Sequence, residues 1–341
     1  MVRVLQSGIV RVTFFHAGAS EFPAPASIDP DHRPELFVRG EHIWTVQTFL
    51  RLLRAGLPVS LADRAAADGL VVFHVKERRA LLRTVPRGAD LLLVGIRADN
   101  RESGLGDIEV VQNGRFADGR RRIFIPHWPQ PGLVPRDPSR GDVLRTAAFK
   151  GFAGNLAEPF RSAAWREFLG RRGIEWVFDA PEFEHDGSHE APVAWWDYSG
   201  VDLVVAVREA EPRGHTAKPA AKLCNAWQAG VPALLGPEYA FRELRRSNLD
   251  YLEVASLAEA EAAVARLQEE PGLFRAMVEN GRRRAVEFSV PAILERWRAL
   301  LFDELPAFAG TPRGWLLRRW PARLKIPLRR LGRRLAMRPT R

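Results

Sequence analysis

The sequence predicts an α/β protein of two domains, each containing an open sheet of parallel strands. Short runs rich in β-branched residues alternate with helical patterns along most of the chain, which is typical of such sheets. The chain has 341 residues, 46% of them hydrophobic, which is enough to form two cores. Residues 131–146 are rich in proline and glycine and lack apolar periodicity, so they are expected to link the two domains.

The first domain is expected to span residues 1–130. An amphipathic helix is predicted over residues 41–55, because apolar side chains recur there every three or four positions. Residues with high strand propensity predict six strands, at 9–15, 57–63, 69–75, 89–96, 107–113 and 121–128.

The second domain is expected to span residues 147–305, followed by a basic amphipathic tail at 306–341. Its predicted strands are 146–152, 174–179, 201–208 and 231–236. Its predicted helices lie near 156–170, 217–229, 257–268, 272–287 and 290–304.

The positive charge of the chain is concentrated at its C-terminal end. Of the 51 basic residues, 11 lie in residues 311–341, which contain no acidic residue, so the other 40 nearly balance the 41 acidic residues. The net charge of +10 therefore indicates the kind of surface that the tail contacts, and it gives no information on the ligand of residues 1–310.

Cysteine content and hydropathy exclude several classes of protein. The single cysteine, Cys224, cannot form an internal disulfide or a cysteine-based zinc cage. The N-terminal segment lacks an apolar run that ends in a small-residue cleavage site, and no stretch reaches the ~18 uncharged apolar residues of a spanning helix. We therefore expect a cytoplasmic protein that does not cross a membrane.

A strand, a polar turn and a helix follow one another over residues 201–229. A helix that begins beyond the carboxyl end of a parallel strand presents free backbone N–H groups to a phosphate. Thr216 is a candidate cap of this helix, and Lys218 and Lys222 are expected on its first turns, near Arg208 at the strand end. The three cations would converge on a diphosphate, although the lysines could equally be solvated surface charges.

The residues from Lys222 to Glu238 resemble the K-L-x-E-x-x-x-x-G-x-P-V-V donor motif of GT-B glycosyltransferases of the group 1, family 4-like type. The resemblance implies two Rossmann-like domains that face a cleft, and a nucleotide-diphosphate sugar as co-substrate with no other cofactor. It also implies that Lys222 contacts the diphosphate. Asn225 stands where those enzymes have a ribose-binding glutamate, and Glu238 would either supply the missing acceptor or cap the next helix.

The same stretch also resembles the donor motif of bacterial fucosyltransferases, so GDP-linked donors are included among the candidates. Members of the first group transfer sugars without a metal ion and with retention of configuration, which the resemblance extends to this chain. Gly151 lies in a glycine-containing turn after the first strand of the second domain, where backbone can approach a phosphate or simply turn tightly.

Polar residues at strand ends of the first domain are candidates for the acceptor side of the cleft. Asp99 and His127 would meet an acceptor hydroxyl, and an inverting enzyme would need one of them, or a carboxylate of the loop at 29–41, as a base. Arg97 would bind an anionic group, although it could also pair with Asp99 at the surface, and His127 could instead hydrogen-bond backbone at the hinge.

The loop that precedes the helix at 41–55 contains Arg33 and Glu35, which we assign to the acceptor side. The same loop has an Asp-x-Asp spacing at residues 29–31. In another glycosyltransferase fold this spacing binds a metal ion, but there it follows a strand, so no metal site is expected here.

Residues 313–336 set tryptophan and leucine side chains at intervals of three to four residues, with arginine and lysine between them. This pattern is typical of a helix that lies on an anionic membrane surface. A solvated disordered tail and a nucleic-acid-binding segment are the alternatives, of which nucleic acid is the least favoured.

The sequence thus predicts a glycosyltransferase that acts on a glycan or lipid-linked acceptor at the inner face of a membrane, in bacterial surface polysaccharide synthesis. A nucleotide-sugar epimerase on the same scaffold and a non-catalytic protein that binds nucleic acid or membrane are the alternatives. Dinucleotide oxidoreductases and P-loop ATPases are disfavoured because neither glycine-rich motif occurs.

Overall fold

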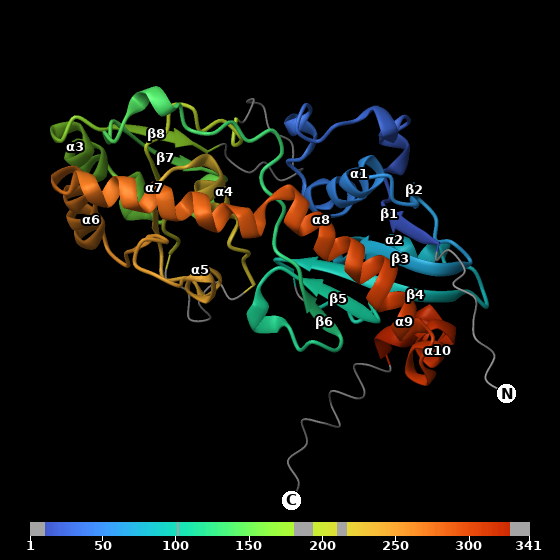
Figure 1. Cartoon of the computed structure of the whole chain (residues 1–341). Coiled ribbons are helices and arrows are strands. Elements are labelled where there is room, and N and C mark those ends of the chain that lie inside the picture. Colours follow the sequence, from blue (N-terminus) through green and yellow to red (C-terminus); the bar gives the residue numbers. More distant parts are fainter. Residues whose placement is uncertain (1–10, 101, 181–193, 210–216, 328–341) are drawn as a thin grey trace, which may run out of the picture.

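The computed structural model describes residues 11–100, 102–180, 194–209 and 217–327, which form two α/β domains (Figure 1). Within each of the two sheets, every paired strand runs parallel to its neighbour. The predicted fold class is therefore confirmed.

The first sheet has six strands in the order β2-β1-β3-β4-β5-β6. Their bounds are Val12–Phe15 (β1), Val59–Ala62 (β2), Asp68–His74 (β3), Asp90–Ala98 (β4), Ile108–Val111 (β5) and Arg122–Phe124 (β6). Each one overlaps a predicted strand. The central strands are buried nearly throughout because helices cover both faces of the sheet.

The expected helix at 41–55 consists of two parts. A π-helical turn, His42–Val46 (η4), leads into α1, Gln47–Arg54. Helix α1 packs on one face of the sheet, where Phe49 contacts Phe14 with ring centroids 5.9 Å apart. A second helix that the sequence analysis did not predict, α2 (Arg78–Thr84), covers the other face.

The second sheet has five strands in the order β11-β10-β9-β7-β8. They are Thr146–Lys150 (β7), Glu175–Asp179 (β8), Leu203–Ala206 (β9), Ala233–Leu235 (β10) and Leu252–Glu253 (β11). The surrounding helices are Ala163–Arg171 (α3), Ala221–Ala229 (α4), Tyr239–Leu244 (α5), Leu257–Glu269 (α6) and Pro271–Ala285 (α7).

The five strands of the second sheet have the same order as the first five strands of the first sheet. In each sheet the first strand lies between the second and the third, so successive connections leave it in opposite directions. Ligands of open α/β sheets bind at the carboxyl ends of the strands at such a switch point. The switch points are β1 with β3 in the first sheet and β7 with β9 in the second.

Short 3-10 turns join many of these elements. They include Ala19–Glu21 (η1), Pro25–Ser27, Pro34–Leu36, Val75–Glu77 (η5), Gly114–Phe116, Pro138–Arg140, Ala153–Asn155, Glu158–Arg161 and Val286–Phe288.

After α7 the chain returns to the first domain (Figure 1). Helix α8 (Val290–Arg298), the π-helical stretch Ala299–Glu304 and α9 (Leu305–Ala309) bury apolar residues in the core that contains β1 and α1. The structure thus differs from the expected boundary at 305, because residues from about 290 onward pack in the first domain. An amphipathic pattern shows that a helix covers a core but not which core it covers.

The described part of the basic tail lies on the first domain. Helix α10 (Pro312–Arg319) contacts β4, and Arg318 pairs with Asp90 at 2.9 Å. Lys325 donates to Asp107 at 2.5 Å, and both side chains are buried. The segment 313–336 is therefore not one continuous helix, since α10 ends before Pro321; residues 328–341 lie outside the described part. No helix among the described residues is long and apolar enough to span a membrane.

Candidate active site between the two domains

A cleft of about 490 Å³ lies between the two domains. The first domain contributes residues 38–41, Ile43, Trp44, Lys76 and Asp99 to its lining. The second domain contributes the turn after β7, the end of β9 and the start of α4. The second-domain wall is thus the switch point of its sheet, where the strand order predicts a ligand.

The structure brings five of the predicted site residues together in this cleft. They are Asp99, Gly151, Arg208, Lys218 and Lys222. Asp99 comes from the first domain and the other four from the second, and the whole set spans more than a hundred positions of the sequence.

Lys222 occupies the first turn of α4 and lies beside the turn after β7. Its Nζ lies 5.4 Å from the centre of the Phe149 ring. Gly151 makes this approach possible, because a Cβ at that position would come within 2.8 Å of Lys222 Nζ, and its φ of 152° is one that residues with a side chain rarely adopt. Burial, together with the nearby charges of Arg208 and Lys150, lowers the pKa of Lys222 to about 7.

Arg208 is held by its neighbours at the end of β9. Its guanidinium pairs with the Glu238 carboxylate and its Nε donates to Asn155 Oδ1 at 3.4 Å. Glu238 is buried and does not line the cleft, so it fixes the position of Arg208. Glu238 is also the residue before α5, but its side chain makes no capping hydrogen bond there.

The start of α4 differs from the expected helix near 217–229. The helix begins at Ala221, and its N-cap, Ala220, provides no side-chain hydrogen bond. Proline at 219 disfavours helical backbone at Lys218, so Lys218 and Lys222 do not share a helix face. The backbone N–H groups of the first turn have no partner within the helix and lie at the cleft. Thr216, the expected cap, lies outside the described residues.

Lys218 reaches across the cleft to the first domain. Its Nζ donates to Asp99 Oδ2 at 2.7 Å, and its carbonyl accepts from Asn113 at 3.2 Å. Burial opposes ionisation of Asp99, but the ammonium of Lys218 outweighs it and lowers the pKa of the carboxyl. Asp99 therefore joins the two domains and does not pair with Arg97.

His127 lies behind the cleft, with its ring 4.3 Å from that of Trp44. Its Nδ1 donates to the carbonyl of Trp128. This is the hydrogen bond to backbone at the hinge that the sequence left open as the alternative role of His127. Burial, with the positive charge of Lys222, lowers the pKa of His127 to about 4. The ring is thus neutral at pH 7 and is a weak base.

Asn225 is directed at the segment that joins the domains. Its Oδ1 accepts from the backbone N–H of Gln130 at 3.1 Å, and the side chain also hydrogen-bonds with Tyr198. Asn225 is buried and is not among the residues that line the cleft.

The structure does not bring three acceptor-side candidates to the cleft. Arg97 stacks on Phe116 at 4.3 Å and donates to the Asn100 carbonyl at 2.9 Å. Arg33 and Glu35 form an exposed ion pair with each other. None of these three lines the cleft.

Three further polar residues line the first-domain wall, namely Arg39, Glu41 and Lys76. Glu41 lies in the 29–41 loop from which a carboxylate base was considered, whereas Arg39 and Lys76 were missed by the sequence analysis. Glu41 lies 3.9 Å from His74, whose pKa is lowered to about 4 by burial. Arg39 and Glu41 lie just before η4 in the connection that follows β1, and Lys76 lies in the turn η5 that follows β3. Only their position beyond the ends of predicted strands could have indicated them.

Comparisons with known proteins support the fold. No protein-family model matches this sequence. No curated protein matches it either. Among solved structures, AviGT4, a glycosyltransferase involved in avilamycin A biosynthesis, matches with a TM-score of 0.53 and 16% identity, over 88% of this chain and 99% of that chain. HepE from Anabaena, solved in complex with UDP and glucose, matches with a TM-score of 0.51 and 13% identity, over 86% of this chain and 99% of that chain.

The chain has the GT-B fold. The pneumococcal O-GlcNAc transferase GtfA, in complex with UDP and GlcNAc, matches with a TM-score of 0.51 and 15% identity over 76% of this chain. This chain spans only 60% of the GtfA chain. The expected GT-B architecture is therefore confirmed, and its cleft contains the cations that the sequence motif predicted.

Proposed function

We propose that this protein is a glycosyltransferase that transfers a sugar from a nucleotide-diphosphate sugar to an acceptor in the interdomain cleft. The observation that carries the proposal is the convergence of Lys222, Arg208 and the uncapped start of α4 at the switch point of the second sheet. Two cationic side chains and free backbone N–H groups are the chemistry that binds a diphosphate. The similar structures of HepE and GtfA were solved with UDP, which agrees with this assignment.

The same groups would stabilise the leaving group without a metal ion. As the bond between the sugar C1 and the diphosphate oxygen breaks, negative charge develops on that oxygen. Arg208 is fixed by Glu238, so it is oriented before the reaction, and the diphosphate raises the protonated fraction of Lys222. Fixed positive groups of this kind would stabilise the leaving diphosphate, which is what a bound divalent cation does in metal-dependent enzymes.

Retention of configuration is the stereochemical outcome that we propose. An inverting reaction needs a base that takes the acceptor proton, and the three candidates are poor bases. Asp99 is paired with Lys218, and the pKa of His127 is about 4. Glu41 belongs to the 29–41 loop and lines the cleft; burial opposes its ionisation, but a backbone hydrogen bond and nearby positive charges outweigh this and lower its pKa. In the retaining reaction the acceptor oxygen bonds to C1 on the face that the diphosphate leaves, and the acceptor proton passes to the departing diphosphate oxygen.

The acceptor is proposed to be a glycan or a lipid-linked glycan, as in bacterial surface polysaccharide synthesis at the inner face of the membrane. The observation in favour of a membrane is the exposed side of the tail. Trp315, Leu316 and Leu324 are about half exposed, although large apolar side chains usually lie inside. Arg319 and Arg323 are exposed beside them, so this surface combines apolar and cationic groups.

Thermal unfolding with and without nucleotides tests the donor site. UDP, GDP, ADP and TDP are added separately to the wild type, to Lys222→Ala and to Arg171→Ala, a control that removes an exposed cation on α3. One nucleotide is expected to raise the midpoint of the wild type and the control, by a stabilisation of about 2.7 kcal/mol at a hundred times its Kd. Lys222→Ala is expected to respond weakly. Equal responses in all three proteins would contradict the proposal.

Transfer itself is tested with the sugar of the stabilising nucleotide. Turnover that needs an acceptor supports a transferase. Turnover without any acceptor would instead support a nucleotide-sugar epimerase on the same scaffold.

A further inference from the structure

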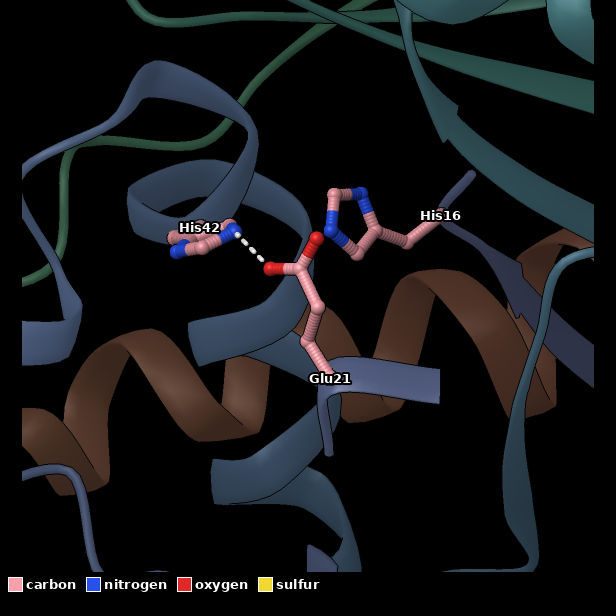
Figure 2. A group of neighbouring side chains, drawn as sticks. All are labelled: His16, Glu21 and His42. Carbon is pink, nitrogen blue, oxygen red and sulfur yellow. Dashed lines mark ion pairs between the residues drawn. The ribbon is translucent and has the colours of Figure 1, made fainter. Parts of the chain in front are cut away.

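A second group of ligand-forming side chains lies at the switch point of the first sheet. His16 follows β1, Glu21 ends the turn η1, and His42 begins the π-helical turn η4. One ligand atom from each of these residues lies within 4.8 Å of the other two. Figure 2 shows the Glu21 carboxylate between the two imidazole rings.

Hydrogen bonds fix which nitrogen of each histidine faces the centre of this group. His16 Nδ1 lies 2.9 Å from Glu77 Oε1, and His42 Nδ1 lies 2.9 Å from the Leu36 carbonyl. Because a carboxylate and a carbonyl only accept, each Nδ1 carries a proton, and in the neutral ring each Nε2 then keeps a lone pair. A histidine whose second nitrogen donates to a carboxylate or a carbonyl is the usual arrangement around a bound metal.

Neither Nε2 atom has a hydrogen bond to another described residue. His16 is 6% exposed, and among the described residues its Nε2 has no hydrogen-bond partner. His42 Nε2 lies 3.7 Å from Glu21 Oε2, which is too long for a hydrogen bond. Two ligands of one tetrahedral zinc ion, at its usual bond lengths, lie about 3.3 Å apart. This pair therefore needs only a small contraction, and atoms as far apart as the 4.8 Å limit of the group would need to approach by up to about 1.5 Å.

Gly18 leaves the space between two of these residues open. A Cβ at this position would meet Glu21 Oε1 at 2.5 Å and His16 Nε2 at 3.0 Å. The turn from His16 to Glu21 can therefore close around a small ion because residue 18 has no side chain.

We infer that His16 Nε2, His42 Nε2 and the Glu21 carboxylate form a binding site for a divalent transition metal of the zinc class. Two imidazoles and one carboxylate suit zinc, cobalt and iron, and a three-residue set leaves a coordination position for water. The Glu21 side chain is 57% exposed, so the site opens to solvent on that side. Glu77 supports His16 from behind and does not touch the metal.

The site is separate from the donor diphosphate. It belongs to the first domain, and the adjacent residues 40 and 41 line the acceptor wall of the cleft. A metal ion there would tie η1 and η4 to the end of β1, and would thereby order the segment that forms this wall. The inference does not depend on the proposed transferase activity.

Cobalt binding to the full-length, chelator-treated protein without an affinity tag tests the site. The wild type is expected to bind one equivalent of Co²⁺ with visible absorption bands of low-coordinate cobalt, which Zn²⁺ abolishes by competition. His16→Ala and Glu21→Gln are expected to lose these bands. Glu77→Gln is expected to weaken the affinity about ten- to a hundredfold while keeping the bands.

His32→Ala is the matched control, because His32 lies in the same segment but is 85% exposed and pairs with Asp29 outside the proposed site. It is expected to bind cobalt as the wild type does. Glu21→Gln lies on an exposed turn, so it keeps the test decisive if His16→Ala does not fold. The inference is wrong if the wild type gives no saturable absorption, or if Glu21→Gln and the wild type bind alike.

Discussion

The depressed pKa of Lys222 predicts that nucleotide binding takes up a proton. Burial and the neighbouring cations lower this pKa from 10.5 to about 7, so at pH 8 about nine-tenths of the free protein has a neutral Lys222. A bound diphosphate replaces the repulsion by Arg208 and Lys150 with attraction and raises the pKa again. Binding at pH 8 is therefore expected to take up about 0.9 proton from the solvent.

The affinity for the nucleotide should therefore depend on pH, because binding is linked to protonation of Lys222. Above pH 7 the Kd for the stabilising nucleoside diphosphate is expected to rise about tenfold per pH unit, until the pKa of Lys222 in the complex is reached. The terminal phosphate itself titrates near pH 6, so measurements between pH 8 and 9 isolate the protein group. Without ligand, the unfolded chain binds more protons than the folded chain between pH 7 and 10.5. The contribution of Lys222 to the free energy of unfolding therefore increases with pH in that range.

Isothermal titration calorimetry in buffers of different ionisation enthalpy measures the proton uptake directly. Lys222→Arg is the matched variant, because arginine stays protonated and should bind with little uptake and a flat pH profile. Uptake near zero in the wild type at pH 8 would refute the reasoning. Equal uptake in Lys222→Arg would assign the proton to another group.

Three further substitutions test the site and the tail. Gly151→Ala should displace the Lys222 ammonium and weaken nucleotide binding by at least about tenfold, whereas Gly154→Ala, whose Cβ meets nothing within 4 Å, should bind normally in the same titration. Glu238→Ala leaves the guanidinium of Arg208 buried without its partner and should lower the free energy of unfolding by about 3 kcal/mol, measured by denaturant titration. Lys325→Met removes the ammonium that neutralises the buried carboxylate of Asp107, so the tail should become sensitive to proteases; unchanged proteolysis would show that the ion pair does not anchor it.

The strands and the donor wall could be predicted because they depend on local pattern. Buried parallel strands are continuous apolar runs, which is why every strand of the first sheet overlaps a predicted run. Arg208, Gly151 and Lys222 meet because strand ends and a helix start converge at a switch point, and the sequence order already implied this.

The remaining parts of the site depend on contacts that a local pattern does not contain. Lys218 leaves the helix because of the proline that follows it, and its partner Asp99 lies 119 positions away in the other domain. Arg39 reaches the cleft from an irregular segment and Lys76 from the short turn η5, and the course of both follows from packing and not from periodicity. The histidines at 16 and 42 likewise meet only because η4 begins beside the end of β1.

Helix α4 explains why an amide stands at position 225. Its first turn presents Lys222 to the cleft, while Asn225 accepts from Gln130 in the segment that joins the domains. Farther along, Trp227 contacts Phe288 with ring centroids 5.5 Å apart, just before the chain returns to the first domain. One helix thus contacts the proposed diphosphate site and both crossings between the domains, so a movement of α4 toward a bound diphosphate would shift both crossings. Position 225 is only 6% exposed, so a carboxylate there would bury a net charge against the segment that joins the domains. The neutral amide oxygen of Asn225 accepts the same backbone N–H without the free-energy cost of burying a charge.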